Sequence, residues 1–256
     1  MYVENFIFED YCKRIGFTGD AQATEQTLNA LMRAHLFSIA FENLDVQAGK
    51  LVSIAPQDIV NKIVYQPRGG YCYEVNSLFA MALAHLNIDY DLIGARPMFY
   101  ATRWAKTHMV VLAKLGGDSY LCDVGFGSFG LRAPYPLSKV NQIVQQDDDY
   151  FQLLSSDGKN FILQAKVDGE WVNQFEFDLY PHDLVDFIPA NFFNSKNPDT
   201  VFVQKLLVVK HNPRGRKILL GDRLKIIEAG VTTLKDYPPH EIPKLLKDEF
   251  GLVQES

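Results

Sequence analysis

The sequence predicts an α+β fold in which helices come first and antiparallel strands follow. Two observations indicate this order. Up to about residue 88, apolar residues recur every three to four positions, which is the spacing of amphipathic helices. From about residue 90, they alternate or form short blocks rich in β-branched residues, which is typical of strands. The 256 residues are enough for one large domain or two to three small ones.

Three amphipathic helices are predicted in the first part of the chain. The first follows Thr24, a residue type that often caps a helix N-terminus. The second begins near Pro56 and ends before Pro67, because proline is tolerated in the first turn of a helix but not in its interior. The third runs from about Cys72 to Leu86 with apolar residues on one face.

A β-hairpin is predicted where the pattern changes period. The segments 108–115 and 119–124 read as strands, and the Gly116-Gly117 pair between them suits a tight turn. Further strands are predicted at 151–154, 161–167, 171–177, 217–220 and 223–228, and an amphipathic helix near 240–250. The polar segment 140–149 is predicted to be a loop. The segment 191–200, rich in Asn, Ser, Pro and Lys, is predicted to be a boundary.

The composition indicates which kinds of partner and which cellular compartment we expect. The net charge is -6, so no broad basic excess exists to neutralise nucleic acid, and we expect no nucleic-acid partner. The three cysteines are widely spaced and form no CxxC pair, which argues against disulfides and against a metal site. The chain lacks a signal-peptide pattern and a long apolar run, so we expect a cytoplasmic protein without membrane contact.

Cys72 is the candidate nucleophile because of its position. It follows Arg68-Gly-Gly-Tyr71 and opens the third predicted helix, where free N–H groups and the helix dipole favour a thiolate. The paired glycines allow a sharp turn that could bring backbone N–H groups to a reacting carbonyl, as in an oxyanion hole. The alternative is a cysteine that packs as a small hydrophobe, with the glycines ending the preceding helix.

His108 and Asp123 are predicted to lie on one face of the hairpin. A two-residue loop pairs Leu115 with Asp118, so His108 falls opposite Gly125 and Asp123 becomes its diagonal neighbour. Such neighbours lie roughly 7–8 Å apart at Cα, within reach of long or aromatic side chains. The pair could orient a base for a thiol nucleophile, or it could be a structural hydrogen bond only.

Four ordered segments then resemble the arylamine N-acetyltransferase family. The resemblance lies in Phe41-Glu-Asn-Leu-Asp45, Arg68-Gly-Gly-Tyr-Cys-Tyr-Glu-Val-Asn76, Thr107-His-Met109 and Asp123-Val-Gly-Phe-Gly127, with a weaker similarity over 186–198. It implies a helical bundle at 1–88, an antiparallel β-barrel at 89–198 and an α/β lid at 199–256, around a triad core like that of cysteine proteases. The oligomeric state is not indicated.

The resemblance also implies a chemistry and a set of site residues. Acetyl-CoA would acetylate Cys72, and an arylamine, hydrazine or arylhydroxylamine would then accept the acetyl group in a ping-pong scheme, with no metal. His108 would be the base and Asp123 the residue that orients it. Substrate-binding residues would be Phe41, Phe126, Gly127 and Phe202, although the chain has 18 phenylalanines and most belong to the core.

Two other functions remain open from the sequence. A thiol hydrolase or amidase would use the same triad with water as acceptor, and a binding protein would carry an unreactive Cys72. Near the nucleophile, Glu42 or Glu74 is expected to form a structural ion pair with Arg68 rather than to act as a catalytic acid. Basic residues such as Arg103 and Lys106 are candidates for contacts with the CoA nucleotide.

Overall fold

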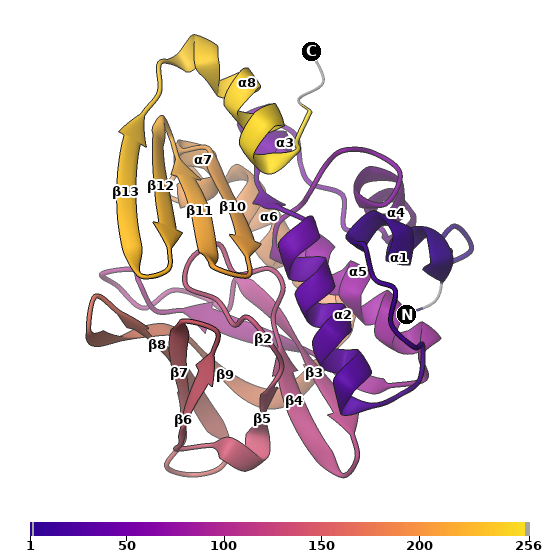
Figure 1. Cartoon of the computed structure of the whole chain (residues 1–256). Coiled ribbons are helices and arrows are strands. Elements are labelled where there is room, and N and C mark those ends of the chain that lie inside the picture. Colours follow the sequence, from indigo (N-terminus) through magenta and orange to yellow (C-terminus); the bar gives the residue numbers. More distant parts are fainter. Residues whose placement is uncertain (2, 254–256) are drawn as a thin grey trace.

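A computed structural model of the chain describes residues 1 and 3–253. Figure 1 shows three parts: helices from the first third of the chain, a sheet from its middle, and a second sheet mostly from its C-terminal third. The first sheet has eight strands and the second has five. The predicted α+β fold is confirmed, with a helical bundle, a nearly closed antiparallel sheet and a C-terminal lid. Within the described residues, no helix combines the length and the apolar character needed to cross a bilayer.

The three predicted N-terminal helices are present. The helices of this part are α1 (Phe8–Ile15), α2 (Glu25–Ser38), α3 (Leu44–Gln47), α4 (Pro56–Ile63) and α5 (Cys72–His85). Thr24 caps α2 as predicted, since its side chain accepts a hydrogen bond from the Thr27 N–H at 3.1 Å. The first twelve residues of α5 are all buried. The helix α5 is therefore surrounded by the rest of the molecule, and its side chains can contact buried groups on all sides.

The eight-stranded sheet is antiparallel and has the order β5-β4-β3-β2-β9-β8-β7-β6. Its strands are β2 (Asp89–Pro97), β3 (His108–Leu115), β4 (Asp118–Cys122), β5 (Tyr135–Pro136), β6 (Ile143–Gln146), β7 (Asp149–Leu154), β8 (Asn160–Val167) and β9 (Glu170–His182). The predicted hairpin register is confirmed, because Leu115 pairs with Asp118. The β3–β4 ladder ends at Val111 and Cys122, so His108 and Asp123 both lie beyond it.

The edges of this sheet approach one another through a side chain. The Gln146 amide oxygen accepts from the N–H groups of Arg132 and Ala133 at 2.8 and 3.1 Å, and its Nε2 donates to the Ala133 carbonyl at 3.0 Å. The prediction of a loop over 140–149 is therefore wrong in part, because β6 occupies four of these residues. An edge strand that exposes most of its side chains has a polar sequence, which resembles that of a loop.

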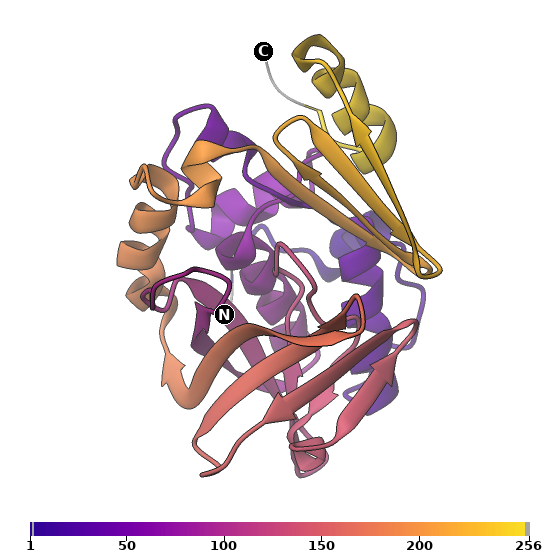
Figure 2. The ribbon, with the colours of Figure 1, turned by 90° about the vertical axis from the view of Figure 1, so that its left-hand side faces the viewer.

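The C-terminal third supplies a second sheet that recruits a strand from the helical part. Its order is β1-β10-β11-β12-β13, from β1 (Phe41–Glu42), β10 (Leu207–Asn212), β11 (Gly215–Leu220), β12 (Arg223–Glu228) and β13 (Val231–Asp236). Figure 2 shows this sheet from the side, with the C-terminal helical segment against it. That segment contains η3 (Pro239–Glu241), α8 (Ile242–Leu245) and η4 (Leu246–Phe250).

The segment expected to be a boundary contains a helix. Between the two sheets the chain forms η2 (Leu184–Phe187), α6 (Ile188–Lys196) and α7 (Val201–Gln204), and a further short helix, η1, covers Leu137–Lys139. Most of 191–200 is thus helical, and the Asn and Ser side chains of the helix, Asn191, Asn194 and Ser195, are buried rather than solvated. The division of the chain into units at residues 88 and 198 stays a prediction.

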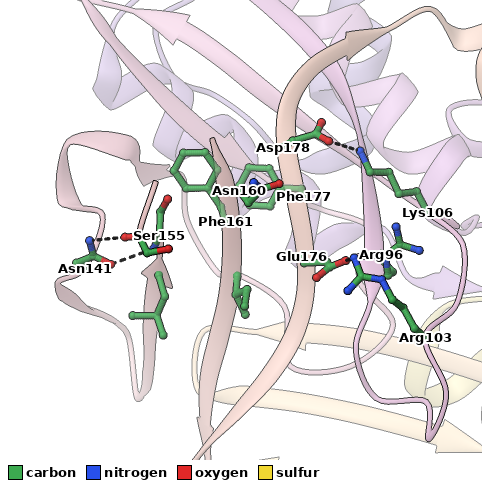
Figure 3. Close-up of a pocket in the computed structure, with 13 residues that line it drawn as sticks. Arg96, Arg103, Lys106, Asn141, Ser155, Asn160, Phe161, Glu176, Phe177 and Asp178 are labelled. Atoms are coloured by element: carbon green, nitrogen blue, oxygen red, sulfur yellow. Dashed lines mark hydrogen bonds and ion pairs between the residues drawn. The ribbon is translucent and has the colours of Figure 1, made fainter. Parts of the chain in front are cut away.

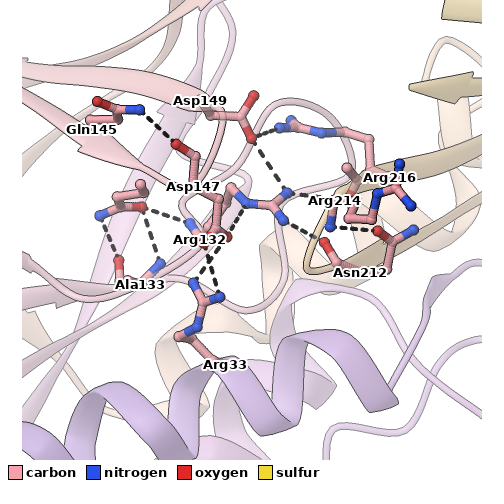
Figure 4. A network of polar contacts seen from close by, with 11 residues as sticks. Arg33, Arg132, Ala133, Gln145, Asp147, Asp149, Asn212, Arg214 and Arg216 are labelled. Atoms are coloured by element: carbon pink, nitrogen blue, oxygen red, sulfur yellow. Dashed lines mark hydrogen bonds and ion pairs between the residues drawn. The ribbon is translucent and has the colours of Figure 1, made fainter. Parts of the chain in front are cut away.

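A network of ion pairs ties the C-terminal sheet to the rest of the molecule (Figure 4). Asp147 accepts from both Nη groups of Arg33 at 3.0 Å and from Arg132 Nε at 2.7 Å. Asp149 contacts Arg216 of β11 and lies 3.4 Å from Arg132. Arg132 also donates to two main-chain carbonyls of the β10–β11 turn. Arg132 and Arg216 are both buried, so the network joins α2, the barrel-like sheet and the lid.

Candidate active site

Cys72 is the first residue of α5 and is 2% exposed. The preceding residue, Tyr71, has an extended backbone and caps the helix, and its N–H donates to Glu74 Oε2 at 3.0 Å. The N–H groups of the first helical turn have no acceptor within the helix, so they favour negative charge at this end. The predicted position of the thiol at a helix start is confirmed.

The two glycines before Cys72 are closely packed, and neither position has room for a side chain. A Cβ on Gly69 would lie 1.9 Å from the Ala40 carbonyl oxygen, and one on Gly70 would lie 2.7 Å from Glu74 Oε2. The Gly70 N–H donates to the Ala40 carbonyl at 3.3 Å. The Gly70 amide is therefore occupied, and an oxyanion hole formed by other N–H groups of this turn stays a prediction.

A buried cluster of charges supports this turn. Arg68 pairs with Glu42 at 2.9 Å, as expected for one of the two glutamates, and with Asp45 at 3.2 Å. Glu74 pairs instead with Lys62 at 2.7 Å. Burial raises the pKa of Glu74 to about 7, in spite of the nearby Lys62 ammonium. These contacts give both glutamates a structural role in the loop before Cys72.

The predicted contact between His108 and Asp123 is present. His108 Nε2 lies 2.8 Å from Asp123 Oδ2, and both residues are buried. Burial by itself would lower the pKa of His108. The Asp123 carboxylate outweighs this effect, and with a contribution from the Cys72 side chain it raises that pKa to about 10. The imidazole is therefore bonded to the Asp123 carboxylate, and Cys72 is close enough to contribute to its raised pKa.

Asn76 contacts the His–Asp pair, a role that was not predicted from the sequence. It lies one turn after Cys72 on α5, and its Nδ2 donates to Asp123 Oδ1 at 3.1 Å and to the Met109 carbonyl at 2.7 Å. Its amide oxygen accepts from the Val124 N–H at 3.0 Å. Asn76 thus joins α5 to β3 and to the loop after β4. Its signals in the sequence were the spacing of four residues from Cys72 and its place at the end of the Arg68–Asn76 segment.

Cys72 and His108 line one cavity of about 280 Å³. The four residues expected to bind substrate also line it: Phe41, Phe126, Gly127 and Phe202. The Phe126 ring packs against the His108 imidazole, with a centroid distance of 5.1 Å. This placement makes the phenylalanines available to an aromatic ligand, and their role in binding stays a prediction.

Other cavity walls carried no signal in the sequence. Phe99 and Tyr100 come from the loop between β2 and β3. Ile218 and Leu220 come from β11, in the part of the chain where no motif was found. Because these walls depend on how the C-terminal sheet meets the cavity, local sequence patterns could not reveal them.

Gly125 lines the cavity and also packs closely against α5. A Cβ on Gly125 would lie 2.7 Å from Cys72 Cα and 2.8 Å from atoms of Val75 and Asn76. Gly125 therefore lets the loop after β4 touch the start of α5. This contact brings Cys72 to the His–Asp pair.

A separate groove of about 570 Å³ contains the basic residues near the β2–β3 loop (Figure 3). Arg96 and Arg103 both contact Glu176, and Lys106 lies 2.6 Å from Asp178. Each of these cations is thus partly neutralised by a carboxylate of β9. The contacts of Arg103 and Lys106 with a CoA nucleotide stay a prediction.

The other cysteines are in different surroundings. Burial raises the pKa of Cys122 well above its usual value, and burial together with Glu9 raises that of Cys12 to about 11. Neither residue lines the cavity. Across residues 1 and 3–253, His, Cys, Asp and Glu side chains form no cluster of three or more that could hold a metal.

Comparison with known proteins identifies the family. Residues 24–255 match the model of a family described as N-acetyltransferase. The arylamine N-acetyltransferase of Escherichia coli is 32% identical over 84% of this chain and 76% of its own length. The solved structure of the Mycobacterium abscessus arylamine N-acetyltransferase superposes with a TM-score of 0.91 at 29% identity, covering 99% of this chain and 92% of the other.

A second solved structure, of the Mycobacterium marinum arylamine N-acetyltransferase in complex with CoA, gives a TM-score of 0.89 at 31% identity and covers 96% of this chain and 93% of the other. The family match spans nearly the whole sequence, including the cavity and the groups around it. The chain therefore belongs to the arylamine N-acetyltransferase family and is an acetyl-transferring enzyme of this kind.

Proposed function

We propose that this enzyme moves an acetyl group from acetyl-CoA to the nitrogen of an arylamine, hydrazine or arylhydroxylamine through a thioester on Cys72. The observation that carries the proposal is the position of Cys72 and His108 at one cavity, with Asp123 bonded to the His108 imidazole behind it. The CoA complex of the M. marinum relative supports acetyl-CoA as the donor. The names of the curated relatives support an aromatic amine as the acceptor.

In the first half-reaction Cys72 Sγ attacks the acetyl carbonyl carbon. The imidazole of His108 holds the thiol proton, and the resulting imidazolium stabilises the thiolate. The bond between the acetyl carbon and the CoA sulfur breaks, and His108 returns the proton to that sulfur. CoA leaves as the thiol. Asp123 keeps the proton of His108 Nε2 in place, so that Nδ1 faces the reaction.

In the second half-reaction the acceptor nitrogen attacks the thioester carbon. The bond to Cys72 Sγ breaks, His108 accepts the proton of the amine, and the acetylated product leaves. Phe41, Phe126 and Phe202 would hold the aromatic ring of the acceptor, because offset or edge-to-face aromatic pairs add to the burial of apolar surface. The thiol must stay reduced for this cycle, which favours the cytoplasm as the site of action.

The test follows the acetyl group on the protein. On mixing with acetyl-CoA in the absence of amine, one equivalent of CoA per chain should be released, and intact mass should rise by one acetyl group. Added arylamine should discharge the group. Cys72→Ala should keep the circular dichroism of the parent and show neither event, while Cys12→Ala should behave like the parent.

Two results would contradict the proposal. Near-normal turnover by Cys72→Ala would remove the thioester from the mechanism. Continuous CoA release without amine would instead identify a hydrolase. The rate of alkylation by iodoacetamide measures the reactivity of the thiol directly. A thiolate–imidazolium pair should be alkylated rapidly well below pH 8.5, whereas a plain thiol should not.

A further inference from the structure

The helix α6 presents polar side chains to the interior of the molecule. Asn191, Asn194 and Ser195 are 4%, 2% and 3% exposed, whereas Ile188 and Phe192 on the other side are 51% and 58% exposed. Figure 2 shows α6 in orange at one side of the molecule. Buried amides and hydroxyls are costly without hydrogen-bond partners. The partners of these three side chains therefore indicate what the helix holds in place.

Asn194 holds the peptide that precedes the catalytic base. Its Nδ2 donates to the Thr107 carbonyl at 2.9 Å, and the Tyr73 hydroxyl donates to the same oxygen at 2.7 Å. The β2–β3 ladder ends with the pair between Ala95 and His108, so the Thr107 carbonyl lies beyond it. These two donors replace the missing ladder partner. They fix the peptide plane from which His108 projects.

Two neighbouring residues of α6, Asn191 and Ser195, contact Tyr71, the residue before Cys72. The Tyr71 hydroxyl donates to Asn191 Oδ1 and lies 3.0 Å from Ser195 Oγ. Asn191 is itself held, because its Nδ2 donates to the Val52 carbonyl at 2.9 Å. Tyr71 is the residue before Cys72 and caps α5. One short helix thus contacts the residue before the nucleophile and the residue before the base.

We propose that α6 is a brace that sets the separation between Cys72 Sγ and the His108 imidazole, with Asn194 as a positioning residue for His108. The inference rests on the proposed function, in which the two groups share a proton. Small displacements matter for such pairs, since a shift of about 1 Å can cost roughly a hundredfold in rate. Asn194 is not among the described residues that line the cavity, so it acts through His108 and not on substrate.

The experiment measures the pH dependence of Cys72 alkylation by iodoacetamide. In Asn194→Ala, the rate at pH 6 should fall by roughly tenfold, because the imidazole no longer stabilises the thiolate well. At pH 10 the rate should stay within about twofold of the parent, because the thiol then ionises without help. The kcat for acetyl transfer should fall, while the KM for acetyl-CoA should change by less than about twofold.

Two further variants keep the test decisive. Tyr73→Phe removes the second donor to the Thr107 carbonyl and only one atom from the core, so it gives the same readout if Asn194→Ala fails to fold. Phe192→Ala changes an exposed residue on the same helix and should keep the pH profile of the parent.

The outcomes separate the brace from the proposed function. Rapid alkylation of the parent at pH 6, with the same ratio of rates at pH 6 and pH 10 in Asn194→Ala and Tyr73→Phe, would overturn the brace alone. A lower melting temperature together with an unchanged ratio of rates would also overturn the brace alone. Slow alkylation of the parent at pH 6 would overturn the thiolate mechanism and the brace together.

Discussion

Asp123 is a buried carboxylate with three hydrogen-bond donors around it. Besides His108 Nε2, it accepts from Asn76 Nδ2 and from the Gly125 N–H at 2.9 Å. The donors come from β3, α5 and the loop after β4. The residue that orients the proposed base is therefore also a junction between elements, and its loss should affect activity and stability together.

We expect Asp123→Ala to abolish acetyl transfer and to lower the free energy of unfolding by about 3–5 kcal/mol, the usual cost of removing one partner from a buried pair. The loss should depend on pH. The pKa of His108 is about 10 in the fold against 6.5 for a free histidine. The stabilisation by the pair is thus complete below pH 6.5 and disappears as pH rises through 10.

Urea unfolding of parent and variant at pH 6 and pH 10 measures this effect. The difference between the two proteins should be larger at pH 6. Equal differences at both values would show that the charged pair does not form. Asp91→Ala is the control, because Asp91 pairs with the half-exposed Lys114 and should cost about 1 kcal/mol or less.

The sequence could predict Asp123 and His108 as partners but not Asn76. The Gly-Gly turn fixes the hairpin register, and the register brings the first two residues together by counting along the chain. The partners of Asn76 lie on the hairpin, and the sequence does not say which face of α5 meets it. A contact between two elements needs their packing, which no local pattern contains.

At the scale of elements, the approach of α5 to the loop after β4 depends on Gly125. We expect Gly125→Ala to lower the free energy of unfolding by about 1–3 kcal/mol through overpacking, and to slow Cys72 alkylation at pH 6. Gly117→Ala is a matched control, since it carries a strain of about 1–2 kcal/mol from positive φ but has open space around it. Unchanged alkylation in Gly125→Ala would contradict the close contact.

Helices and strands could be predicted from the sequence where the apolar periodicity and the turn residues matched the way the element packs. The helices α2, α4 and α5 have an apolar periodicity and clear ends, and the β3–β4 hairpin has its glycines. The helix α6 overlaps the segment predicted to be a boundary and has no clear helical pattern in the sequence, because its buried face consists of Asn and Ser, residues that favour turns. Their partners are tyrosines and a carbonyl more than 80 residues away in the chain.

At the scale of the molecule, the buried arginines hold the lid against the cavity. Arg216, Ile218 and Leu220 alternate along β11 and so share one face, and the last two line the cavity. The lid position therefore depends on the network around Asp147 and Asp149. None of this was visible in the sequence, because arginines and aspartates usually indicate solvated surface.

We expect Arg132→Met to cost about 1–3 kcal/mol of unfolding free energy, because the main-chain carbonyls of Gly215 and Asn212 lose a charged donor inside the molecule. Amide hydrogen exchange should become faster in β10 and β11 than in α5, and the KM for the amine should rise. Arg223→Met, which breaks an exposed pair in the same sheet, should cost about 1 kcal/mol or less. Uniform acceleration of exchange would show that the network does not act on the lid.

The two-residue strand β1 has a consequence for exchanging parts between relatives. Phe41 and Glu42 pair with Val209 and Val208 of β10, yet they precede them by more than 160 positions. A chimera that took its last third from another member of the family would graft a foreign β10 onto the native β1. Transplants that shift acceptor preference should therefore carry residues 41–42 along with the C-terminal strands.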